Sequence, residues 1–152
     1  MDGLSSGCQS SNSLGCTLPK PSRTKTVSAS QVRAYAAKAD EYAAAAESEF
    51  EAGRMVAATS LAIHAAINAA DAVCGARLGR RSYGPDHDQV LSLLRQAGID
   101  GAEVDKDLRR LLPLKSRAEY QPDAIAASVA SKAVERARRC ATIARRVANA
   151  VQ

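Results

Sequence analysis

Apolar residues recur every three or four positions from about residue 28 onwards, which is the spacing of one face of an α-helix. The first such segment has a clear start. Ser28 and Gln31 have the spacing of a capping box, and Val27 and Val32 have that of a hydrophobic staple. The pattern continues to Gly53, a residue suited to end a helix, so it predicts a helix over residues 28–53.

A second helical segment follows almost at once, from Arg54 to about Gly79. It contains no Asp, Glu, Lys or Arg between Met55 and Asn68, so we expect it to be the most buried element of the fold. Because the connection between the two segments is very short, we expect them to form an antiparallel pair.

Three further helices are predicted, over residues 86–98, 100–113 and 122–150, with irregular connections at 80–85 and 114–121. The expected caps and breakers are Asp86 with Gln89, Gly98, Asp100 with Glu103, Pro113, and Pro122 with Asp123. Ile99 and Val104 have the spacing of a second staple.

Residues 1–27 are rich in Ser, Gly, Thr and Pro and show no periodicity, so we expect a disordered tail before one domain at 28–152. Hydrophobic residues make up 46% of the chain, and alanine, a strong helix former and poor strand former, supplies many of them. The fold class predicted is all-α, an antiparallel bundle of about five helices.

The formal net charge of +5 favours contact with phosphate or an acidic partner, although only weakly. The four cysteines have no zinc-ligand spacing, and no metal-ligand cluster, Gly-rich phosphate loop or Ser-His-Asp signature is evident. We therefore expect no cofactor. Without a secretory signal or a membrane-spanning run in the sequence, we expect a cytoplasmic protein that does not contact a membrane.

One face of the second helix carries a polar stripe of Ser60, His64, Asn68 and Asp71, at spacings of four, four and three. On so apolar a helix these side chains need partners or water. The stripe is therefore either a hydrogen-bonded network at a solvent edge or dimer face, or the wall of a functional pocket.

Two groups of residues suggest phosphate chemistry. His87, in the first turn of the third helix, could act as a general base, and Arg81, six residues earlier, could neutralise charge on a phosphodiester. A surface histidine beside a cap is the plainer interpretation. Arg117 and Tyr120, before the last helix, could hold a phosphate, or Arg117 could cap carbonyls and Tyr120 fill the core.

The last helix is strongly basic. It contains a single acid among them, Glu135, and all six of its cations lie on one stripe or beside it: Lys132, Arg136, Arg138, Arg139, Arg145 and Arg146. Such a stripe is either a solvated face or a phosphate-binding surface, for which Arg136, Arg139 and Arg146 are the candidates. With one Phe and four Tyr, base stacking cannot be the main mode of binding.

Taken in order, several segments resemble the HEPN family over about residues 30–150. They are Phe-Glu-Ala-Gly at 50–53, Ala-Ala-Thr-Ser-Leu-Ala-Ile-His-Ala-Ala-Ile-Asn-Ala-Ala-Asp-Ala-Val at 57–73, Asp-His-Asp-Gln-Val at 86–90, and Arg-Ala-Glu-Tyr at 117–120. The resemblance implies an antiparallel bundle, usually a homodimer. Many members of this family are metal-independent ribonucleases or toxin partners of small nucleotidyltransferases.

The catalytic motif of that family is Arg, four to six residues, then His, near the last core helix. Arg117 resembles its Arg, but residues 118–125 contain no His. We therefore expect a non-catalytic module that binds nucleic acid, a nucleotide or a partner protein, with a nucleotidyltransferase-type partner as one option. The alternative is a toxin-type endoribonuclease that uses His87 with Arg81 or Arg117.

Overall fold

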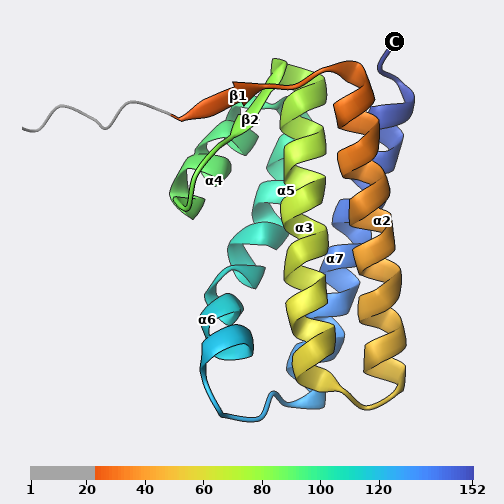
Figure 1. Ribbon diagram of the computed structural model, residues 1–152, viewed down its shortest axis with the longest axis vertical. Helices are drawn as coiled ribbons and strands as arrows, with labels where there is room; N and C mark the ends of the chain where they lie inside the picture. Colours follow the sequence, from red (N-terminus) through yellow and green to blue (C-terminus); the bar gives the residue numbers. More distant parts are fainter. Residues whose placement is uncertain (1–22) are drawn as a thin grey trace, which may run out of the picture.

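The computed structural model describes residues 23–152, which form six helices and one two-stranded antiparallel sheet (Figure 1). In chain order the elements are β1 Thr24–Thr26, α2 Ala29–Glu51, α3 Met55–Leu78, β2 Arg80–Ser82, α4 His87–Gln96, α5 Gly98–Leu111, α6 Pro113–Tyr120 and α7 Ala127–Asn149. The predicted all-α class and antiparallel bundle are confirmed.

The central helix is α3, as its apolar sequence predicts. Figure 1 shows α2 and α7 along one side of α3, and α4, α5 and α6 along the other. By length and composition alone α3 could cross a membrane, but most of its residues are buried inside the bundle. Most of these buried residues are alanines, whose small side chains allow neighbouring helices to approach closely.

The predicted start of α2 is confirmed in detail. The Ser28 backbone N–H donates to Gln31 Oε1 at 2.9 Å, and the Gln31 N–H donates to Ser28 Oγ at 3.2 Å. The staple valines, Val27 and Val32, are buried against Gly75 of α3. A Cβ added at Gly75 would lie 2.8 Å and 2.9 Å from their methyl groups, so glycine is what permits this close approach.

The two strands correct the prediction of an irregular loop at 80–85, and β1 lies just before the predicted domain boundary at residue 28. The segment before α2 returns beside the segment after α3, and Lys25 pairs with Arg81 in an antiparallel register. Gly79, at φ +71°, ends α3 and turns the chain, and its carbonyl accepts from the Val27 N–H at 2.9 Å. A strand of three residues is too short to show the alternation of apolar and polar residues by which strands are predicted. Tertiary contacts, rather than local sequence, therefore determine this pairing. The rest of the expected tail, residues 1–22, lies outside the described residues.

The segment around Pro113 is the second correction. The sequence predicts that Pro113 ends a helix and that 114–121 is irregular, whereas Pro113 opens α6. Proline suits the first turn of a helix, where its missing N–H has no partner to lose. The last helix then begins at Ala127 rather than Pro122, because residues 121–126 are non-helical and Ile125 is buried beneath α6 and α7.

The start of α5 is a third correction. This helix begins at Gly98, at φ +72°, so Asp100 lies in its first turn and does not cap it. Ile99 is 81% exposed and forms no staple with Val104. Asp100 instead accepts from two arginines, Arg77 at 2.5 Å and Arg146 at 2.6 Å.

Candidate anion-binding face

The polar stripe of α3 lies along the open side of the helix, and its residues differ in burial. Ser60, His64 and Asn68 are half-buried, whereas Asp71 is buried, at 9% exposed. The Asn68 side-chain amide donates to the His64 carbonyl at 2.8 Å. His64 Nε2 lies 3.6 Å from Glu119 Oε1 of α6. This part of the stripe is therefore a local network that ties α3 to α6.

His64 also has an aromatic neighbour. Its ring lies 5.5 Å from the ring of Tyr42 in α2, with a tilt of 31°. The histidine thus sits between α2 and α6 on the surface of α3, within reach of solvent. The hydrogen-bonded network that the sequence allows is thus present at this position, and a functional role for the stripe as a pocket wall stays a prediction.

The other end of the stripe, at Asp71, is associated with the sheet. Lys25 and Arg81 are directly opposite each other on β1 and β2, so their side chains share one face. Lys25 Nζ lies 4.0 Å from the centre of the Tyr83 ring, and Arg81 Cζ lies 5.3 Å from that of Tyr35 in α2. We call this surface, with Lys38 and Asp71 beside it, the sheet face.

Positive charge on the sheet face is incompletely balanced. Within residues 23–152, neither Lys25 nor Arg81 forms an ion pair with a carboxylate. Like charges directly across a ladder destabilise it, and an anion bound between them would relieve that repulsion. Contact with the Tyr83 and Tyr35 rings offsets only part of the cost.

Asp71 is the acid nearest to this face. Burial raises its pKa to about 7, although the positive charges of Arg81 and Lys38 act in the opposite direction. At neutral pH the carboxyl group is therefore only partly ionised, and it does not fully neutralise Arg81. The charge of the sheet face accordingly depends on pH near neutrality.

The arginines of α7, in contrast, are matched by acids from other helices. Arg139 forms two hydrogen bonds with Asp107 of α5, at 3.0 and 2.7 Å, and Arg145 forms two with Asp40 of α2, at 3.0 and 2.8 Å. Arg146 pairs with Asp100, as described above. Binding of nucleic acid by Arg136, Arg139 and Arg146 stays a prediction, and any phosphate there would compete with these carboxylates.

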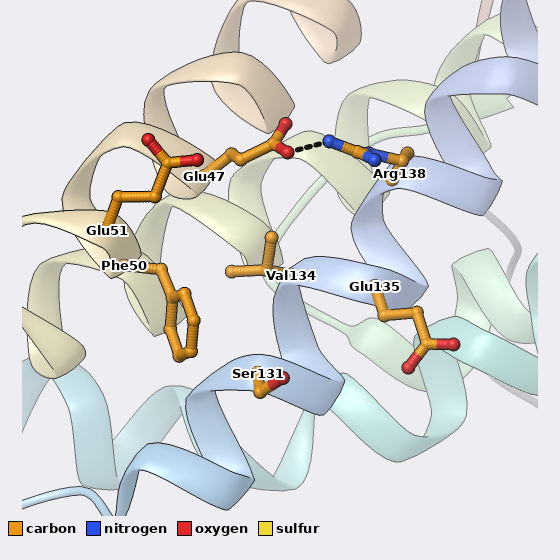
Figure 2. Close-up of a pocket in the computed structure, with 7 residues that line it drawn as sticks. All are labelled: Glu47, Phe50, Glu51, Ser131, Val134, Glu135 and Arg138. Atoms are coloured by element: carbon orange, nitrogen blue, oxygen red, sulfur yellow. Dashed lines mark ion pairs between the residues drawn. The ribbon is translucent and has the colours of Figure 1, made fainter.

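A cavity of about 350 Å³ between α2 and α7 shows the same matching (Figure 2). Arg138 points toward Glu47 and pairs with it, and Glu51 and Glu135 also line the cavity. Because three carboxylates and only one guanidinium line this cavity, it disfavours phosphate.

The proposed catalytic residues are distributed over separate elements. Ser82 Oγ lies 3.4 Å from the Gln89 side-chain amide of α4, so α4 lies on the Ser82 side of β2. Since successive strand residues point to opposite faces, Arg81 faces away from α4, whose first residue is the half-buried His87. Within the described part of the chain, no hydrogen bond or ion pair joins these two.

Arg117 and Tyr120 lie on α6 rather than on a loop. Arg117 donates to the Ala124 carbonyl at 3.2 Å, which is the capping role that the sequence allows. Tyr120 is 78% exposed and does not fill the core. Their proposed phosphate contact stays a prediction.

Two cysteines, Cys74 and Cys140, are buried free thiols. Burial raises the pKa of Cys74 to about 12 and raises that of Cys140 as well, so neither is activated as a nucleophile. Among residues 23–152, no group of three His, Cys, Asp or Glu side chains is placed to hold a metal ion.

Comparison with known families agrees with this architecture. The family model described as HEPN domain matches residues 32–152. The chain belongs to the HEPN domain family. The match begins in the first turn of α2 and includes every later element, whereas β1 and Lys25 precede it. The sheet face therefore combines HEPN residues with a strand from outside the matched region. No match was found among curated proteins.

The sheet face was not predicted from the sequence, because no pattern there brings Lys25, Tyr35 and Tyr83 together with Arg81 and Asp71. The available signal was weak: a Thr-Lys-Thr segment before α2 and an Arg-Arg-Ser segment directly after the glycine that ends α3.

Proposed function

We propose that this HEPN protein binds RNA through the sheet face and does not cleave it. The HEPN match supports a helical module of the nucleotide-binding or ribonuclease type. The observation that carries the more specific proposal is the cross-strand pair of Lys25 and Arg81, which have no carboxylate partner among the described residues. Phosphate contacts of this kind supply most of the affinity of non-specific nucleic-acid binding.

Several features favour a polymer as the ligand of this face. Lys25 is exposed on an open strand, Arg81 lies opposite it on β2, and Lys38 is exposed on α2. The cations are thus spread over two strands and a helix, which suits a chain of phosphates. Tyr83, which is 45% exposed, can add limited stacking on a base.

The test is binding of a labelled single-stranded RNA, measured by fluorescence anisotropy between 50 and 200 mM salt. The double variant Lys25→Ala/Arg81→Ala should weaken binding about tenfold or more and lower the slope of log K against log salt by about 1 to 1.4. A matched control, Arg95→Ala/Lys106→Ala, removes the same charge from exposed positions on α4 and α5 and should change little. Equal losses in both variants, or no binding at 50 mM salt, would refute the proposal.

The pH dependence gives a second test. Because Asp71 ionises as the pH rises through about 7, RNA binding should weaken over that range. The variant Asp71→Asn should retain the affinity of the low-pH form at pH 8. If wild type and Asp71→Asn respond identically to pH, the sheet face is not where RNA binds.

The absence of cleavage is tested separately, by incubating purified protein with RNA in a chelator. We expect intact RNA, because Arg81 faces away from α4 and His87. Cleavage that is lost in His87→Ala but kept in Lys106→Ala would favour the endoribonuclease alternative.

A further inference from the structure

A second cavity lies where three helices meet, far from the sheet face. It has a volume of about 440 Å³ and is lined by the C-terminal end of α5 and the first turns of α6 and α7. In Figure 1, β1 and β2 lie at the upper end of the bundle, whereas α6 and the start of α7 lie toward the lower end. This cavity is therefore separate from the proposed RNA-binding surface.

The lining residues are of two kinds. Pro113, Leu114 and Val129 form an apolar wall. The other lining residues are all cations, and they come from α5 and α7: Arg109, Arg110, Lys132 and Arg136. No carboxylate lines this cavity, in contrast to the cavity between α2 and α7.

Nearby acids balance only some of these cations. Arg109 pairs with Asp105 one turn earlier on α5, at 3.0 Å. Arg136 is 3.9 Å from Asp107, but Asp107 is already bound by Arg139 through two shorter hydrogen bonds. Among residues 23–152, no carboxylate forms an ion pair with Arg110 or Lys132. The cavity therefore carries an excess of positive charge.

The helix geometry adds to this excess. The N-cap of α7, Ala126, offers no side-chain acceptor, and the first turn of α7 contains no acid. Val129, in that turn, lines the cavity. The partial positive charge of the α7 N-terminus thus reinforces the cations around the cavity.

We propose that this cavity binds a small organic phosphate monoester with an apolar or aromatic body. Arg110, Lys132 and Arg136 would hold the phosphate, and Leu114 and Val129 would contact the body. A monoester carries about −1.5 to −2 charge at neutral pH, which suits two unpaired cations and a partly paired third. The hollow is open to solvent, and its mixed apolar and cationic lining favours an amphipathic ligand over a bare anion.

The experiment uses the full chain and three probes: phenyl phosphate, inorganic phosphate and phenol. Binding is followed by calorimetry and by amide chemical shifts. Phenyl phosphate should bind about tenfold more tightly than inorganic phosphate, because it adds apolar contact with Leu114 and Val129. Phenol should not bind measurably. Amide shifts should concentrate in residues 109–116 and 127–136.

Substitutions identify the site. Arg110→Ala/Lys132→Ala should lower the affinity for phenyl phosphate about tenfold or more, and Arg110→Lys/Lys132→Arg should keep most of it. The control Lys106→Ala, at an exposed position one turn before Arg110, should have no effect. Val129→Ala should weaken binding of phenyl phosphate but not of inorganic phosphate, which separates apolar contact from charge.

Three results would overturn the proposal: no phenyl phosphate binding at about 10 mM, equal affinity for phenyl phosphate and inorganic phosphate, or equal losses in the double alanine variant and Lys106→Ala. RNA binding by Arg110→Ala/Lys132→Ala should match that of wild type. Unchanged RNA binding in this variant would show that the phosphate site and the sheet face act independently.

Discussion

The buried carboxyl group of Asp71 makes stability depend on pH in a way that one substitution should remove. The pKa of Asp71 is raised from 3.8 to about 7 in the folded protein, chiefly by burial. In the unfolded chain the same group loses its proton near its ordinary pKa. Between these two values the folded state binds more protons, so its stability must fall as the pH rises.

The size of the effect follows from linkage. One pH unit corresponds to about 1.4 kcal/mol per proton, and the folded and unfolded pKa values differ by roughly three units. Most of the cost appears between pH 5 and pH 8, where we expect wild type to lose about 2 to 3 kcal/mol through Asp71 alone. The variant Asp71→Asn has no proton to lose at this position and should not show this loss.

The measurement is the free energy of unfolding in urea, at pH 5 and pH 8, for wild type and Asp71→Asn. Comparing the two pH-dependent changes cancels any constant effect of the amide on packing. Asp123→Asn, which removes an exposed carboxylate between α6 and α7, is the control and should follow wild type. If Asp71→Asn also follows wild type, Asp71 is ionised normally in the folded protein, and the charge balance described for the sheet face is wrong.

Three further substitutions test the packing of the bundle, each by urea unfolding. Gly75→Ala should cost about 1 to 3 kcal/mol, because its Cβ would lie within 2.9 Å of two valine methyl groups; a neutral result would mean that the start of α2 moves freely from α3. Ser28→Ala should cost about 1 kcal/mol through loss of the capping box, and an unchanged midpoint would contradict that role. Arg139→Ala should cost about 1 to 2 kcal/mol, because Asp107 is buried but Arg136 remains close enough to compensate in part. Adding Asp107→Asn to Arg139→Ala should lower the free energy of unfolding little further. Full additivity of the two substitutions would show that Arg139 and Asp107 do not interact.

Local signals in the sequence were reliable at the start of α2, but not at the starts of α5 and α7. The capping box at Ser28 and Gln31 depends only on residues three positions apart, and the structure reproduces both of its hydrogen bonds. The burial of α3 also follows from its lack of charge. Signals with two physical meanings were less reliable: Pro113 can end one helix or begin another, and the structure shows that it begins α6.

Contacts between distant segments could not be predicted. The partners of the α7 arginines lie far away in the sequence, with Arg139 and Arg145 separated from their acids by 32 and 105 positions. The sequence of α7 alone therefore shows a stripe of positive side chains but not the acids on other helices that pair with them. The sheet face has the same origin, because β1 and β2 are brought together by the pairing of α2 with α3.

The placement of α7 also has a consequence for the protein during its synthesis. Until α7 emerges from the ribosome, the nascent chain presents one side of α3 uncovered, and Asp40, Asp100 and Asp107 lack partners on α7. Apolar and acidic surface that later becomes helix interface would then be exposed together. The bundle should close in a late and concerted step, when α7 covers the alanines on the exposed side of α3 and pairs with these three carboxylates.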